Sequence, residues 1–148
     1  MPCPNAPRFV RINGKSMMPL LEDGDIGIVL SKSHYNIGDI VIYKYSQGCG
    51  EATLSHRIVY KDENLCYCKG DNSLNLERIT RAEIIGMIVS VERKGKIVTL
   101  LSDEKLLKEF CGFSLKCALK HEAGDSEAAK QMAKRCYIEM YKLSRKLQ

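Results

Sequence analysis

Ser16 and His56 are two residues whose types and surroundings predict nucleophilic chemistry. Ser16 follows a glycine turn and precedes an apolar Met-Met-Pro segment, where a serine has little reason to serve a hydrophobic core. His56 stands beside Arg57 at the start of an apolar, β-branched run. A serine hydroxyl becomes an effective nucleophile when a base accepts its proton, and imidazole can do so near neutral pH. The pair therefore predicts acyl transfer, with Ser16 attacking a carbonyl carbon and His56 acting as general base.

Three segments together resemble the active-site boxes of signal peptidase I and its relatives, the SOS-repressor autoproteases. They are the serine segment at 14–26, the His-Arg pair at 56–57 and the Lys-Gly-Asp-Asn segment at 69–72. Bacterial members typically carry lysine as the base, so His56 is similar to the endoplasmic-reticulum and archaeal branch of the family. Three boxes in the right order are far more specific than any one of them.

The resemblance also implies an acid that supports the base. Asp71 matches the aspartate with this role in the family, and Glu77 falls where the histidine branch often has a second aspartate. The backbone N–H of Ser16 is the implied donor to the oxyanion of the tetrahedral intermediate. Gly14 stands where some relatives carry a serine as a further donor, whereas many others carry glycine there.

The relatives bind an extended substrate alongside a strand edge, with small side chains in shallow pockets near the cut. Met17, Met18 and Pro19 are the candidates for the apolar floor of that groove. Packing in the core explains the two methionines equally well, because flexible thioethers serve cores and binding surfaces alike.

Residues 9 to about 100 show the short alternating pattern of β structure. Gly-Asp turns feed β-branched runs at 24–30 and 38–43, and further runs lie at 57–60, 65–68, 84–91 and 96–100. Strands at this spacing predict a mainly β fold, a coiled antiparallel sheet or small barrel, which is also the fold that the family resemblance implies. We therefore assign residues 1–100 to a β peptidase domain.

Beyond residue 101 the apolar period becomes helical, and the family resemblance has stopped at about residue 92. Ser102 is the expected N-cap of the first helix, and a Gly-Asp-Ser break at 124–126 precedes a second helix. The second helix bears a stripe of methionine and tyrosine, which either packs on its own domain or docks a partner protein or a membrane surface. Residues 101–148 are thus a C-terminal α-helical extension.

The composition predicts a soluble globular chain of 148 residues, long enough for one domain. No apolar run approaches the ~20 residues that cross a bilayer, and the first residues lack the apolar core of a signal peptide. Seven cysteines at irregular spacing favour a reducing compartment over a disulfide framework. We expect a cytoplasmic protein, for which a partner protein is one means of association with a membrane.

Neither a metal nor a cofactor is expected. Cys66 and Cys68 share one face of a predicted strand, but two further ligands at matching spacing are not evident. The sequence shows neither a glycine-rich phosphate loop nor a cofactor fingerprint. A net charge of only +5, without interleaved aromatic and basic residues, does not support nucleic-acid binding. The expected partner is a peptide or protein substrate.

Three functions follow from these residues. The favoured one is a serine endopeptidase that cleaves leader or signal-like peptides. A second, from another class, is a catalytically idle β module that binds peptides or a partner in the same groove, although retention of all three polar roles argues against it. The third is a self-cleaving repressor, which is disfavoured because it needs a lysine at position 56, and a cleavable linker and a DNA-binding domain ahead of Ser16.

Overall fold

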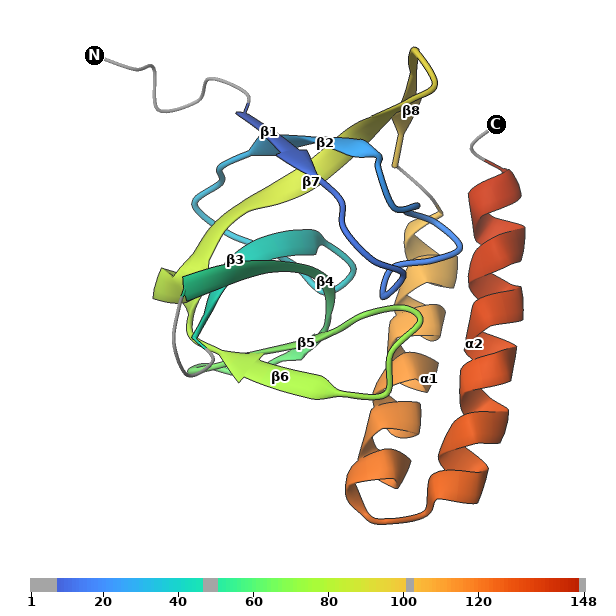
Figure 1. Ribbon diagram of the computed structural model, residues 1–148. Helices are drawn as coiled ribbons and strands as arrows, with labels where there is room; N and C mark the ends of the chain where they lie inside the picture. Colours follow the sequence, from blue (N-terminus) through green and yellow to red (C-terminus); the bar gives the residue numbers. More distant parts are fainter. Residues whose placement is uncertain (1–7, 47–50, 101–102, 147–148) are drawn as a thin grey trace.

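The computed structural model describes residues 8–46, 51–100 and 103–146. Strands come first in this part of the chain and two helices follow (Figure 1). The strands are β1 (Arg8–Arg11), β2 (Ile26–Leu30), β3 (Ile40–Ser46), β4 (Glu51–Lys61), β5 (Cys66–Lys69), β6 (Leu76–Ile79), β7 (Ile84–Arg93) and β8 (Lys96–Thr99), with a short 3-10 turn at Arg81–Glu83. The helices are α1 (Glu104–Glu122) and α2 (Ser126–Arg145).

The described strands form one antiparallel sheet in the order β1-β2-β7-β3-β4-β5-β6, and β8 pairs with β7. The long strand β7 connects two parts of this sheet, because its first half pairs with β3 and its second half pairs with β2 and β8. The part from β3 to β6 curves round on itself below β1 and β2 (Figure 1). The predicted coiled antiparallel sheet with a helical extension is confirmed.

The two helices form a hairpin on one side of the sheet (Figure 1). Helix α1 lies next to the strands, and α2 packs on the outer side of α1. The cap of α1 differs from the prediction, because the carboxylate of Asp103 accepts the N–H of Leu106 at 3.1 Å, while Ser102 lies outside the described residues. Asp125 caps α2 in the same way, through the N–H of Ala128 at 3.2 Å. Neither helix, within the residues described, is long and apolar enough to cross a membrane.

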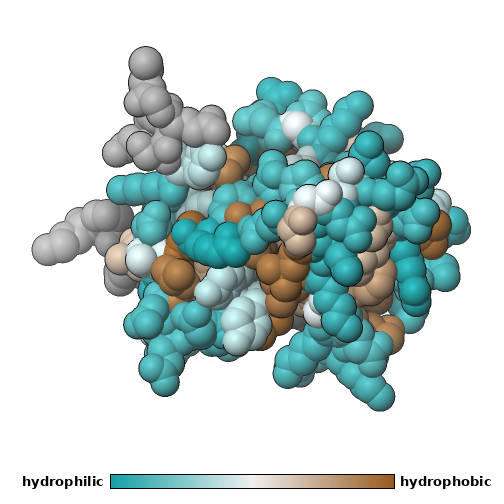
Figure 2. All heavy atoms as spheres, turned by 90° about the horizontal axis from the view of Figure 1, so that it is seen from below, coloured by the Kyte–Doolittle hydropathy of each residue, from teal (hydrophilic) through white to brown (hydrophobic). Residues whose placement is uncertain are grey.

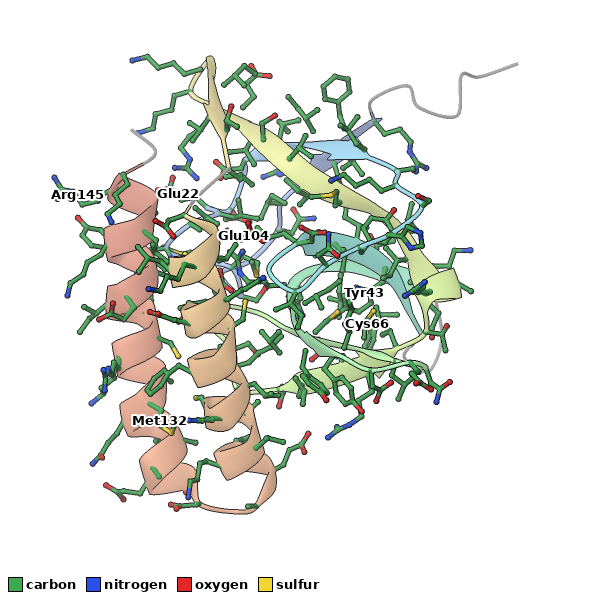
Figure 3. The ribbon with its side chains drawn as sticks, turned by 180° about the vertical axis from the view of Figure 1, so that it is seen from behind. Glu22, Tyr43, Cys66, Glu104, Met132 and Arg145 are labelled. Atoms are coloured by element: carbon green, nitrogen blue, oxygen red, sulfur yellow. The ribbon has the colours of Figure 1, made fainter. Side chains whose placement is uncertain are left out.

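Two clusters of buried side chains lie on opposite faces of β4. One lies between the sheet and the helices and draws residues from both. The other lies inside the curve of β3 to β6, where Figure 3 labels Tyr43 and Cys66. Successive side chains of a strand point to opposite faces, so Ile58 belongs to the second cluster and Val59 to the first. The same alternation separates His56, on the face of Ile58, from Arg57.

Candidate active site

Ser16 lies half-buried in the loop between β1 and β2. Gly14 opens this loop with φ at +84°, a left-handed conformation that glycine adopts without strain. The Gly14 N–H donates to the carboxylate of Asp23 at 2.8 Å, and the Met18 N–H donates to the carbonyl of Lys15 at 3.1 Å. These bonds close a tight turn around Ser16, so the local sequence alone accounts for much of its position.

His56 contacts a hydroxyl with one ring nitrogen and a carboxylate with the other. Its Nε2 lies 3.2 Å from Oγ of Ser16, and its Nδ1 lies 2.7 Å from Oε1 of Glu77. A carboxylate only accepts hydrogen bonds, so these partners assign the proton to Nδ1 and leave Nε2 to accept from the serine. The His56 side chain is only 8% exposed, which restricts the imidazole to this orientation. Ser16, His56 and Glu77 thus form a hydrogen-bonded chain.

Glu77 reaches His56 because of the strand that carries it. In β6, Glu77 lies opposite Cys68 of β5, and Cys68 lies opposite Ile58 of β4. The side chains of His56 and Glu77 therefore point into the same curved interior from strands that flank β5. The concave curvature of the sheet brings them together, and the long glutamate arm covers the remaining distance.

Tyr43 is a member of the site that the sequence did not reveal. Its hydroxyl lies 3.0 Å from Oε1 of Glu77 and 3.1 Å from Nδ1 of His56. Because Nδ1 carries a proton, the hydroxyl donates to Glu77. Burial and the charge of Glu77 raise the pKa of Tyr43 far above its usual range, so the hydroxyl keeps the proton that it donates. Two donors thus converge on one oxygen of Glu77.

Asp71 is placed differently from the sequence expectation that it would orient His56. Its two carboxylate oxygens accept hydrogen bonds from Nε and Nη2 of Arg57, at 2.9 and 2.8 Å. Arg57 directly follows His56 on β4 and so points to the opposite face, toward α1. Burial opposes the charge of Arg57, but Asp71 outweighs it and the pKa of Arg57 is raised. The position that the resemblance gave to Asp71 is occupied by Glu77.

The loop that carries Asp71 contacts the serine turn through the neighbouring Asn72. Next to Asp71, the Asn72 N–H donates to the carbonyl of Ser16 at 2.8 Å, and the Asn72 side chain donates to the carbonyl of Lys15 at 3.1 Å. The carboxylate of Asp71 therefore lies one residue away from the backbone contacts around Ser16 and bonds Arg57.

The three residues expected to floor the substrate groove have separate surroundings. Met17 is 2% exposed, and its sulfur accepts the N–H of Asp71 at 3.4 Å, so it belongs to the core and not to a groove. Pro19 lines a small hollow with Tyr141 of α2, on a side that does not include His56. Met18 is half-buried and stays a candidate for substrate contact.

Gly70 is required where the two loops meet. A Cβ at this position would lie 2.7 Å from the carbonyl oxygen of Ser16 and 3.1 Å from Nε2 of His56. Since a backbone oxygen cannot move aside alone, we expect Gly70→Ala to push Ser16 from His56 and to lower stability by about 1–3 kcal/mol. Chemical denaturation measures the stability, and the cleavage rate reports the displacement.

The matched control for this substitution is Gly112→Ala in α1, where an added Cβ meets nothing within 4 Å. Alanine is the better helix former, so this variant should be unchanged or more stable by up to about 1 kcal/mol. Wild-type stability and cleavage in Gly70→Ala would contradict the close approach of the two loops.

A coiled antiparallel sheet that aligns a serine, a histidine and a carboxylate defines a serine peptidase domain. Within that class, the family model described as Peptidase S24-like matches residues 2–89, more than half of the chain, and the chain belongs to this family. The matched range contains Ser16, Tyr43, His56 and Glu77, whereas α1 and α2 lie outside it. No curated protein and no solved structure matches the chain.

Proposed function

We propose that this protein is a serine endopeptidase that cleaves leader or signal-like peptides by acyl transfer. The observation that carries the proposal is the hydrogen-bonded chain from Ser16 through His56 to Glu77. A nucleophile and a base within hydrogen-bond reach, with the base oriented by a third group, is the arrangement that activates a serine. The substrate class rests on the resemblance of the His-Arg pair to the histidine branch of the signal peptidases.

The reaction proceeds in two halves. Oγ of Ser16 attacks the scissile carbonyl carbon while Nε2 of His56 takes its proton, and Glu77 stabilises the imidazolium that forms. The backbone N–H of Ser16 is the candidate donor to the oxyanion. His56 then gives the proton to the leaving amine, which leaves an acyl ester on Ser16. A water molecule, deprotonated by His56, then attacks this ester. His56 returns that proton to Oγ of Ser16 as the second peptide leaves.

A pool of diverse peptides, incubated with wild type and with Ser16→Ala and analysed by mass spectrometry, tests the proposal. Cuts that appear only with wild type are the expected result, and the residues around them identify the substrate class. Labelling of Ser16 by a fluorophosphonate reports the activated serine without a peptide. Uncut pools together with an unlabelled serine would overturn the proposal in favour of a binding module, and the intact mass of the protein would reveal self-cleavage.

A further inference from the structure

A cleft of about 660 Å³ adjoins two of the three residues of the proposed catalytic chain. His56 and Glu77 lie at one side of it, and Leu54 and Leu76 contribute apolar walls. The helical extension completes the cleft, because His121 and Glu122 at the C-terminal end of α1 also line it. His56 and Glu77 lie within the range of the Peptidase S24-like match, whereas the two helical residues lie beyond it.

A surface ion pair connects the end of α1 to the strand that carries Glu77. Arg78 follows Glu77 in β6, and its Nη1 and Nη2 donate to the two oxygens of Glu122, each at 2.9 Å. The same guanidinium stacks over the ring of Tyr67, 5.5 Å from its centroid. In Figure 1, β6 and the end of α1 lie together at the bottom of the molecule, and Figure 2 shows apolar surface exposed among hydrophilic side chains from that side.

The cleft has a negative character that the whole chain does not share. The charged groups among its described lining residues are the carboxylates of Glu77 and Glu122, and the other titratable groups there are the imidazoles of His56 and His121 and the phenol of Tyr45. The C-terminal end of α1 adds the negative end of the helix dipole. The charged side chains that line the cleft are thus acidic, whereas the chain as a whole carries a net charge of +5.

We propose that the cleft receives a basic side chain of the substrate, a lysine or an arginine close to the scissile bond, and that α1 thereby sets the specificity of the peptidase. This inference rests on the proposed function. The long aliphatic stem of such a side chain would pack between Leu54 and Leu76, and its charged head would face the carboxylates. An acidic side chain would meet like charge in the same place.

Two substitutions that break one ion pair in opposite ways provide the test. Glu122→Gln removes a negative charge from the cleft, whereas Arg78→Gln breaks the same pair but leaves Glu122 to face the substrate. The two side chains are 36% and 43% exposed, so their pair contributes little to stability and both variants should fold. The measured quantity is the ratio of kcat/KM for two peptides that differ only by lysine or glutamine at one position.

Wild type should cut peptides with lysine or arginine enriched at one fixed distance from the scissile bond. Glu122→Gln should lower the lysine-to-glutamine ratio by about two- to fivefold, as expected for a partly exposed charge pair, and Arg78→Gln should leave or raise it. Added salt should weaken the preference in wild type. Equal changes in both variants, or no enrichment of basic residues, would overturn the role of the cleft.

Fluorophosphonate labelling of Ser16, carried out on the same three proteins, distinguishes failure of the cleft proposal from failure of the proposed peptidase activity. Labelling and cleavage without a basic preference would overturn the cleft proposal alone. Neither labelling nor cleavage in wild type would overturn the proposed peptidase, and the specificity that depends on it would fall as well.

Discussion

Glu77→Gln should lower turnover by about 10⁴-fold and leave the fold intact, as the corresponding change does in the serine-protease triad. Glutamine matches the shape of glutamate, but its amide NH₂ can donate to Nδ1 of His56. The imidazole proton then moves to Nε2, the atom that must accept the proton of Ser16 in the present geometry. Turnover of a cleaved peptide measures the loss, and thermal unfolding confirms the fold.

Two milder substitutions show whether Glu77 acts through orientation and charge. Glu77→Asp keeps the negative charge on a shorter arm, so it should retain more turnover than Glu77→Gln. Tyr43→Phe removes only the second donor to the Glu77 oxygen. A hydrogen bond to a charged group contributes about 1.5–3 kcal/mol, so the expected loss of turnover is about 10- to 150-fold, still well below that of Glu77→Gln. Near wild-type turnover in Glu77→Gln would exclude Glu77 as the group that orients the base.

The nucleophile and the base could be predicted because their signals are local. Gly14 and the Met-Met-Pro segment mark a turn around Ser16, and the β-branched run after His56 marks a strand. Each signal spans a few residues, and the structure realises them as a loop stabilised by its own backbone bonds and as strand β4. The short β-branched runs along residues 9–100 and the helical period after residue 101 also predicted the fold class.

The carboxylate that orients His56 could not be chosen from the sequence. The choice depends on which face of β4 each of the two acids approaches. Asp71 is close to the serine loop, but Arg57 occupies the face of β4 that Asp71 approaches. Glu77 lies on β6, a strand of four residues that mixes leucine, glutamate, arginine and isoleucine without the alternation that predicts a strand. Its pairing with β5 creates the strand, and that pairing is tertiary information.

Tyr43 and Met17 also have tertiary contacts that the local sequence could not predict. Tyr43 falls on a strand that the sequence predicted, yet its contact with Glu77 joins residues 34 positions apart. Met17 follows the nucleophile directly, but it turns into the core beneath the loop. Local sequence predicts that such residues are apolar or buried, whereas the partner of each is decided by the curvature of the sheet.

Asp71→Asn should lower the free energy of unfolding by about 3–5 kcal/mol, the cost of removing one partner from a buried ion pair. Arg57 and Asp71 are 3% and 2% exposed, so the guanidinium left behind has little access to water. Its Nη1 would keep the carbonyl of Gly38 at 2.8 Å, which satisfies one donor but does not neutralise the charge. Chemical denaturation measures the change in free energy. In thermal unfolding, the midpoint temperature should fall by about 10 °C or more.

The matched control is Glu122→Gln, which also removes the carboxylate from a bidentate arginine pair but at the surface. Solvent can replace that partner, so the expected loss of stability is below about 1 kcal/mol. Equal losses in Asp71→Asn and Glu122→Gln would show that the interior pair is not held in a desolvated site.

Turnover of Asp71→Asn, measured well below its unfolding midpoint, distinguishes support of the serine loop from direct action on the base. The backbone bond from Asn72 to Ser16 does not involve the Asp71 carboxylate, so the folded variant should keep much more turnover than Glu77→Gln. Wild-type stability with a loss as large as that of Glu77→Gln would assign Asp71 to the chemistry itself. A less stable variant that remains active when folded fits a buried pair whose task is to fix the loop at 70–72 against the nucleophile.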